Sequence, residues 1–391
     1  MDGPTLGALP PFNTIGHRER TNVLQALKRP LSGYLGGSTP RGGYWTDRLE
    51  TEWTDVFGCR YAIPCNSATS GLLAASMAAG IGPGDEVWTT PYSMSATAAV
   101  AKVLGAHVRF IDIEPIRYSL DPKLLSLRPP PKALIVTNLF GHPAYLAVLR
   151  CWCDDMKVVM IEDNAQSIYA KEGKHYAGTI GHMGVFSLNV HKHLQVGEGG
   201  VVCTMDEGYS RALRMAINHG ELAPSGHTGL NLRMTEPTAA MACAQLARGP
   251  EIIKGRRRLG NILNDMTKNI PWMAASVTDI DCTHSYYVWS ALVDNPARRR
   301  KLVHELNLRG FPMREGYSKL LTEVFKSPDK CPEAYRIEHE KIITFDVCDH
   351  DPKAHHIRRM REVVEYVAHA IDRRSEWISP DARSTTVSRP I

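Results

Sequence analysis

Two short apolar runs, each followed at once by polar residues, constrain the fold of this chain more than any other feature. Residues 158–161 (VVMI) lead into Asp163, and residues 183–186 (MGVF) lead into Ser187. Short apolar runs bounded by turn residues are typical of buried strands in a parallel sheet. Because ligands of open α/β sheets lie beyond the carboxyl ends of such strands, we expect Asp163 and Ser187 to share a ligand site.

Strand and helix signals alternate along much of the chain. Apolar runs at residues 107–112 and 133–137 are separated by helix-forming stretches, and this alternation indicates βαβ units. With 391 residues, the chain exceeds one ordinary hydrophobic core. The predicted parts are an N-terminal arm, a large domain, a smaller C-terminal α/β domain and a disordered tail, at residues 1–20, 21–249, 250–374 and 375–391.

A lysine follows the second apolar run closely. Lys192 lies five residues after Ser187. An aspartate, a hydroxyl and a lysine at one sheet edge suit pyridoxal 5′-phosphate (PLP), because a lysine amine forms a Schiff base with its aldehyde. The carboxylate would pair with the pyridinium nitrogen, and the hydroxyl would donate to the phosphate. On spacing alone, an equally good alternative is that Asp163 caps a helix, Ser187 completes a turn and Lys192 is solvated.

Four short motifs resemble those of one enzyme family. They are E-D-N-A-Q-S at residues 162–167, G-T-I-G at 178–181, F-S-L-N-V-H-K-H at 186–193 and G-E-G-G at 197–200. The pattern is similar to that of the sugar aminotransferases of the DegT/StrS type, which are fold-type-I PLP enzymes. The similarity extends from about residue 20 to about residue 370. The resemblance implies an α/β fold whose large domain has a mostly parallel, seven-stranded sheet flanked by helices.

The resemblance also implies roles for individual residues. Asp163 would pair with the pyridine nitrogen, and Gln166 would lie near the 3-hydroxyl of the ring. Ser187 would bind the phosphate, and Lys192 would be the Schiff-base lysine.

A second phosphate-binding element is expected where a strand, a turn of small residues and an alanine-rich helix follow one another from residue 61. A helix N-terminus with hydroxyl and amide donors is a ready anion site. The family has S-G-T where this chain has Ser67-Ala68-Thr69. Ala68 and Thr69 are therefore candidate phosphate ligands, and helix capping by Ser67 is compatible with that role.

One position departs from the family pattern. Related sequences have an aromatic residue that stacks on the PLP ring at the third position after a proline, and here that position is Met94. A thioether can pack against a π face, with a contact worth at most about 1.5 kcal/mol. Either Met94 supplies the ring contact or Tyr92 has taken it over, and the register favours Met94.

The segment after residue 228 carries the family pattern G-x-N-x-R-M-x-E. In that family the asparagine reaches the phosphate of the other subunit, so Asn231 implies a homodimer with shared active sites. Taken alone, Asn231 would be a loop residue and Arg233 an ion-pair partner of Glu236.

His191 and His193 flank Lys192. A metal site needs convergent ligands with a defined geometry, so no metal is expected here. A neighbouring imidazolium would lower the pKa of the lysine amine, which favours the neutral form that attacks an aldehyde.

Charge, cysteine content and apolar runs indicate which partners and which compartment to expect. The net charge of +5 comes without a dense basic stripe and interleaved aromatic residues, so no nucleic-acid partner is expected. The compact basic runs, residues 256–258 and 298–301, lie in helix-like segments and are expected to be solvated faces. Nine scattered cysteines without a secretory signal indicate reduced thiols in a cytoplasm. No apolar run approaches the roughly 20 residues needed to span a bilayer, so no membrane partner is expected.

Together these features predict a PLP-dependent aminotransferase. The resemblance implies glutamate or glutamine as amino donor, and the keto group of a nucleotide-linked sugar or a cyclitol as acceptor. One alternative is a PLP-dependent dehydratase of keto-deoxysugars, although relatives with that activity have histidine in place of the lysine. The other alternative is a non-catalytic PLP-binding sensor, against which the joint presence of Asp163, Ser187, Lys192 and Asn231 argues.

Overall fold

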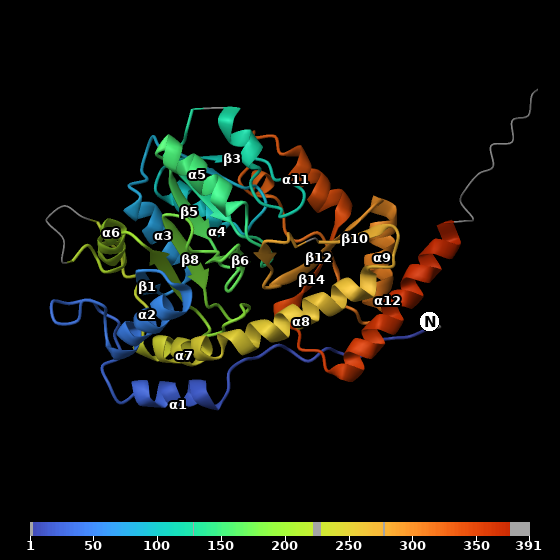
Figure 1. Ribbon diagram of the computed structural model, residues 1–391, viewed down its shortest axis with the longest axis horizontal. Coiled ribbons are helices and arrows are strands. Elements are labelled where there is room, and N and C mark those ends of the chain that lie inside the picture. The colour runs from blue at the N-terminus through green and yellow to red at the C-terminus, as the bar shows by residue number, and fades with distance from the viewer. Residues whose placement is uncertain (1–2, 128, 222–227, 277, 376–391) are drawn as a thin grey trace, which may run out of the picture.

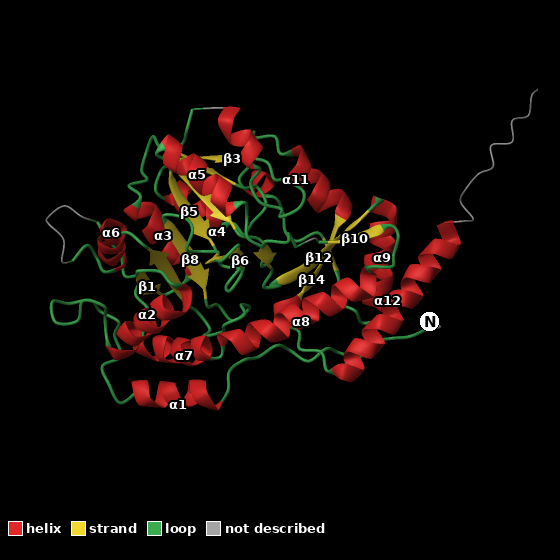
Figure 2. Cartoon of the chain, viewed as in Figure 1, coloured by secondary structure: helices red, strands yellow, loops and turns green. Residues whose placement is uncertain are grey.

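The computed structural model describes residues 3–127, 129–221, 228–276 and 278–375. Its helices and strands form two parts that lie side by side, one around a large sheet and one around a small sheet (Figures 1 and 2). Apart from Ser375, the tail predicted to be disordered lies outside the described residues.

Seven strands form the large sheet, in the order β1-β9-β8-β5-β4-β2-β3. The strands are β1 Tyr61–Cys65, β2 Glu86–Thr89, β3 His107–Phe110, β4 Ala133–Thr137, β5 Val159–Asp163, β8 Met183–Ser187 and β9 Gly200–Thr204. Only the two pairings made by β9 are antiparallel. The predicted seven-stranded, mostly parallel sheet is therefore confirmed.

Helices cover both faces of this sheet, which explains why its strands are continuous apolar runs rather than alternating ones. Every residue of β4, β8 and β9 is buried. One face packs against α3 Ala68–Ala78, α4 Ala96–Val103 and α6 Glu207–Ile217. The other packs against α2 Tyr44–Phe57, α5 Leu146–Met156 and α7 Glu236–Ala247 (Figure 1).

The small sheet is antiparallel throughout, in the order β10-β12-β14-β13. Its strands are β10 Met273–Ala275, β12 Val288–Val293, β13 Arg314–Glu315 and β14 Ile342–Asp346. Three helices enclose a second core against it: α8 Gly249–Thr267, α9 Pro296–Leu308 and α12 Ala354–Ser375. The short elements are β6 Lys171–Glu172, β7 His175–Tyr176, β11 Cys282–Thr283, α10 Leu321–Val324, α11 Pro332–Arg336 and a π-helical turn, η2 Ile337–Lys341. The predicted domain boundary at residue 250 stays a prediction.

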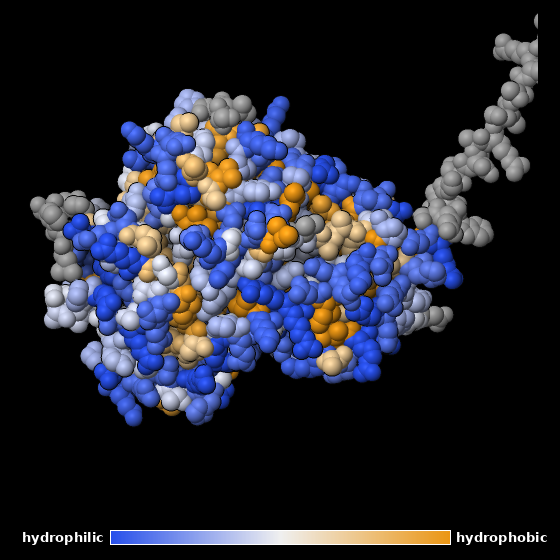
Figure 3. Space-filling view, viewed as in Figure 1, coloured by the Kyte–Doolittle hydropathy of each residue, from blue (hydrophilic) through white to orange (hydrophobic). Residues whose placement is uncertain are grey.

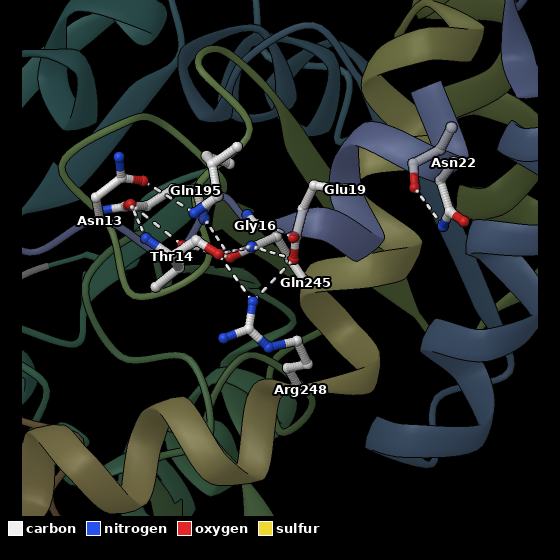
Figure 4. Close-up of polar contacts among 10 residues, drawn as sticks. Asn13, Thr14, Gly16, Glu19, Asn22, Gln195, Gln245 and Arg248 are labelled. Carbon is white, nitrogen blue, oxygen red and sulfur yellow. Dashed lines mark hydrogen bonds and ion pairs between the residues drawn. The ribbon is translucent and has the colours of Figure 1, made fainter. Parts of the chain in front are cut away.

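The N-terminal arm connects the two parts. It begins beside the small sheet, where the Leu6 amide donates to the Arg309 carbonyl at 2.6 Å, and it runs beneath α8 to α1 His17–Ala26 (Figure 1). Near α1 the arm enters a buried polar network in which Thr14 contacts both Gln195 and Gln245 (Figure 4). Through Gln195, hydrogen bonds thus connect the arm to the loop that follows Lys192.

The basic runs are only in part the solvated faces that were predicted: Arg258 and Arg300 are exposed, but their neighbours are not. Arg256 on α8 is buried and donates to the carbonyls of Val347 and His350, at 2.8 and 2.6 Å. Its neighbour Arg257 donates to two further carbonyls, and Arg299 on α9 is also buried. The prediction is wrong for Arg256 and Arg257 because carbonyls at chain bends need donors, and a long guanidinium side chain can supply several at once.

Polar side chains cover most of the face seen in Figure 3, with apolar ones in separate patches. No helix in the described parts of the chain is long and apolar enough to cross a membrane.

Candidate active site

A cavity of about 430 Å³ lies at the carboxyl ends of the parallel strands. Because these ends meet at one edge of the sheet, segments distant in sequence converge there. Seven of the eight predicted site residues line the cavity: Ala68, Thr69, Met94, Asp163, Gln166, Ser187 and Lys192.

Asp163 is the last residue of β5 and its carboxylate is buried at the cavity wall. It accepts a hydrogen bond from the Thr97 hydroxyl at 2.6 Å and one from the Ala165 amide at 3.2 Å. Burial raises the pKa of Asp163, while these donors and the charge of Lys192 oppose the rise. A carboxylate has about four lone-pair sites, so Asp163 retains capacity to pair with a protonated ring nitrogen in the cavity.

Lys192 lines the same cavity from the loop that follows β8. Its Nζ is 4.1 Å from the centre of the Tyr287 ring. Desolvation lowers the pKa of this amine from 10.5 to about 8, against the opposing effect of the negative charge on Asp163. An amine with this pKa loses its proton far more readily than an ordinary lysine, as a nucleophile for an aldehyde must.

The predicted cause of this shift is wrong. His193 is buried with Nε2 3.0 Å from the Ser285 carbonyl, and burial lowers its pKa to about 3, so it is a neutral imidazole. His191 is largely exposed, 3.6 Å from Asp349. Burial of the amine, rather than a neighbouring imidazolium, lowers the pKa of Lys192.

The other end of the cavity suits an anion. Ser67 caps α3 by accepting from the Ser70 amide at 3.1 Å, which leaves the first N–H groups of the helix, those of Ala68 and Thr69, without partners inside it. Gly200 of β9 allows this close packing, since a Cβ there would lie 2.7 Å from the Ala68 nitrogen. Ser187 adds a hydroxyl to the same cavity. Amides, a hydroxyl and a helix N-terminus are the donors that a phosphate dianion prefers.

Met94 and Tyr92 have different environments. Met94 lines the cavity and is 59% exposed. Tyr92 is fully buried and donates its hydroxyl to Glu338 at 2.6 Å. Tyr92 is thus held away from the cavity, and Met94 is left as the candidate for contact with a bound ring.

Asn231 is the one predicted residue that does not line the cavity of its own chain. It is exposed on the segment that leads into α7. The expected Arg233–Glu236 pair does not form: Arg233 donates to the Asn218 side chain at 3.1 Å. Glu236 instead accepts from the amides of residues 45 and 46 and so caps α2.

Three residues of the site were missed from sequence. Tyr287 and Tyr317 line the cavity from the small-sheet side. Thr97 is buried in the first turn of α4 and bonds to Asp163. Thr97 lies in an ordinary helical stretch, and the two tyrosines lie more than 90 residues beyond Lys192. No local pattern marks them, because their place depends on how the two sheets pack.

Comparisons with known proteins identify the family of this chain. Residues 25–347 match the model of the DegT/DnrJ/EryC1/StrS aminotransferase family, and the chain belongs to that family. The chain is 29% identical over 346 residues to the L-glutamine:2-deoxy-scyllo-inosose aminotransferase of Streptomyces kanamyceticus, covering 82% of this chain and 81% of that protein. It is 32% identical over 216 residues to the UDP-2-acetamido-2-deoxy-3-oxo-D-glucuronate aminotransferase of Pseudomonas aeruginosa, covering 54% and 60%.

The fold has close counterparts among solved structures. An aminotransferase from Psychrobacter cryohalolentis superposes with a TM-score of 0.84 at 23% identity, over 93% of this chain and all of that one. The sequence-based prediction of a PLP-dependent aminotransferase is therefore confirmed.

Proposed function

We propose that this enzyme transfers an amino group from glutamate or glutamine to the keto group of a nucleotide-linked sugar or a cyclitol. The observation that carries the proposal is the convergence of Lys192 and Asp163 on one cavity. Membership of the family supports the reaction, and the named relatives support the two classes of acceptor.

In this proposal each wall of the cavity holds one part of PLP. Asp163 pairs with the ring nitrogen and keeps it protonated, and Gln166 lies beside the 3-hydroxyl. The N-terminus of α3 and the hydroxyl of Ser187 hold the phosphate. Met94 packs against the ring. Bound PLP would supply an aldehyde for amines and a ring that accepts electrons.

Lys192 has two tasks in this scheme. As a neutral amine it binds the cofactor, and after displacement by the donor amine it accepts and returns the proton that moves during transfer. Its lowered pKa suits both tasks, because proton transfer is most efficient when the pKa of the base lies near the working pH. A dehydratase of the related type would have histidine at this position, so Lys192 favours transfer.

We also infer a homodimer in which Asn231 completes the phosphate site of the other subunit. Its exposure and its absence from the cavity of its own chain support this arrangement. The nine free cysteines favour a reducing compartment such as the cytoplasm.

The cofactor absorbance tests the function directly. Purified enzyme with PLP should show an absorbance band that free PLP lacks, because the cofactor is held by Lys192. Lys192→Ala should abolish this band, while Lys174→Ala, at an exposed turn, keeps it. Glutamate or glutamine should then convert the cofactor to its amine form. If no amino acid bleaches the band, the transfer reaction is refuted. A screen of nucleotide keto-sugars against free inososes, following the return of the band, would identify the acceptor.

A further inference from the structure

Tyr317 lies where the cofactor cavity meets a second hollow. That hollow, of about 290 Å³, is lined partly by Arg314, Asp346 and Asp349, and it shares Tyr317 with the cavity around Lys192. Tyr317 comes just after β13, so it reaches the cavity from the small-sheet side. Tyr317 thus lines both the cofactor cavity and the second hollow.

The hydroxyl of Tyr317 is already held by one partner. The Gln166 Nε2 donates to the Tyr317 oxygen at 2.7 Å. The orientation of the Gln166 amide is fixed, because its Oε1 accepts from the Phe140 backbone N–H at 2.9 Å. Tyr317 is therefore the acceptor in this contact, and its own proton has no acceptor among the described residues. A group inside the cavity can take that hydrogen bond.

A buried carboxylate fixes the backbone of Tyr317. Glu338, on the π-helical turn η2, accepts from the Tyr317 amide at 2.9 Å and from the Tyr92 hydroxyl at 2.6 Å. Gly316 allows this close approach of the backbone to Glu338, since a Cβ there would lie 2.2 Å from the Glu338 Oε1. Glu338 thus joins Tyr92, on the large-sheet side, to Tyr317, on the small-sheet side.

We propose that Tyr317 donates a hydrogen bond to the 3-oxygen of bound PLP, beside Gln166, and that Glu338 is the positioning residue that holds Tyr317 there. The inference rests on the proposed function, in which Gln166 lies next to that oxygen. The Nε2 of Gln166 has a second proton, so the amide and the phenol can donate to the same oxygen.

The Tyr317 phenol keeps its proton at neutral pH, because burial raises the pKa of Tyr317 to about 12. The charged groups that face it are Asp163, Arg314 and Glu338. With PLP bound to Lys192, a hydrogen bond from Tyr317 would stabilise negative charge on the 3-oxygen and so would lower the pKa of the Lys192 nitrogen, which sets the colour of the bound cofactor. Removing the donor should raise that pKa.

The experiment is a pH titration of the cofactor absorbance in the PLP-loaded enzyme, together with the dissociation constant of PLP. In Tyr317→Phe the midpoint should rise by about one pH unit, the size of one hydrogen bond to a charged group. Glu338→Gln should shift the midpoint in the same direction by less. Tyr335→Phe, at a tyrosine that is 53% exposed on α11, should match the wild type.

A wild-type midpoint in Tyr317→Phe, with PLP still bound, would overturn the inference and leave the proposed function intact. If Tyr317→Phe folds poorly, Glu338→Gln carries the test, because it leaves the hydroxyl in place and weakens only its support. An unshifted midpoint in that variant also overturns the inference. A wild-type enzyme with no cofactor band would instead refute the proposed function itself.

Discussion

The two sides of the cavity are built in different ways. On one side Asp163 and Ser187 stand at the ends of neighbouring strands, each directly after its apolar run. On the other side Tyr287 and Tyr317 come from segments around the small sheet, far along the chain. The first side depends on local order in the sequence, and the second depends on packing between two sheets. In the proposed function, the carboxylate and the hydroxyl that hold the cofactor thus lie on the side with the stronger local signal.

The strand-end side itself contains a sharp contrast between adjacent carboxylates. Glu162 accepts from three backbone amides in residues 178–181 and from the Asn138 side chain, all within the protein. Among the residues that the structure describes, Asp163 has two donors, Thr97 and Ala165, and it faces the cavity. Burial raises the pKa of both groups. Because the hydrogen-bonding capacity of Glu162 is used within the protein, its role is structural. Asp163 has unused acceptor capacity and can therefore bind a ligand.

The largest expected effect comes from removing the charge of Asp163, which makes its side chain neutral. Asp163→Asn should lower turnover by about 10²–10³-fold, because the ring nitrogen loses the charge that keeps it protonated. PLP should still bind through Lys192. The measurement is kcat with the absorbance spectrum of the bound cofactor.

Glu162→Gln is the matched control for Asp163→Asn. It should lower the melting temperature, because one of its four donors then faces an NH₂ group, while turnover per folded molecule changes little. Equal losses of turnover in the two variants would contradict the division between a structural and a chemical carboxylate.

The second prediction tests whether the cavity has a third side, contributed by another subunit. Lys192→Ala and Asn231→Ala should each be nearly inactive as homodimers. Mixed after unfolding and refolding together, they should recover about a quarter of wild-type activity, because half of the dimers are mixed and each has one intact site. A mixture of Lys192→Ala with Asp163→Asn is the control, since both defects fall on the same side and no site is restored. No recovery in the first mixture would mean that Asn231 does not serve a partner.

The difference between the strand-end side and the small-sheet side of the cavity also explains which features could be predicted from the sequence. The seven-stranded sheet and the cluster around Asp163 follow from apolar runs and from motifs that stand directly beside them. Tyr317 and the burial of Arg256 could not be predicted, because each depends on a partner from a distant segment. The lowered pKa of Lys192 was expected, but its cause was assigned to neighbours in sequence rather than to burial.

The third prediction concerns the pH at which Lys192 reacts. The rate of PLP capture by the cofactor-free enzyme should rise with pH up to about 8 and then level off, because the neutral amine is the nucleophile. Asp163→Asn should move this midpoint to lower pH, since the carboxylate charge opposes the fall in the amine pKa. Stopped-flow absorbance measures both rates. A rate that keeps rising to pH 10 would show an amine with the ordinary pKa of a solvated lysine.

The smallest expected effect lies outside both sides of the cavity, in the N-terminal arm. The Thr14 hydroxyl donates to Gln245 at 2.7 Å and contacts Gln195 at 3.2 Å, and Gln195 lies three residues after Lys192 (Figure 4). Thr14→Val keeps the shape of the side chain but leaves buried amide groups short of a partner. We expect a loss of about 1 kcal/mol in the free energy of unfolding and a several-fold weaker PLP affinity.

Thr51→Val, at an exposed position on α2, is the control for Thr14→Val and should change neither quantity. The two measurements separate two roles of the arm. Weaker PLP binding beyond what the stability loss explains would mean that the arm positions the lysine loop, and so belongs functionally to the cavity. A stability loss with unchanged PLP affinity would mean that the arm only fastens the two sheets together. The lysine loop would then be positioned by the large and small sheets alone.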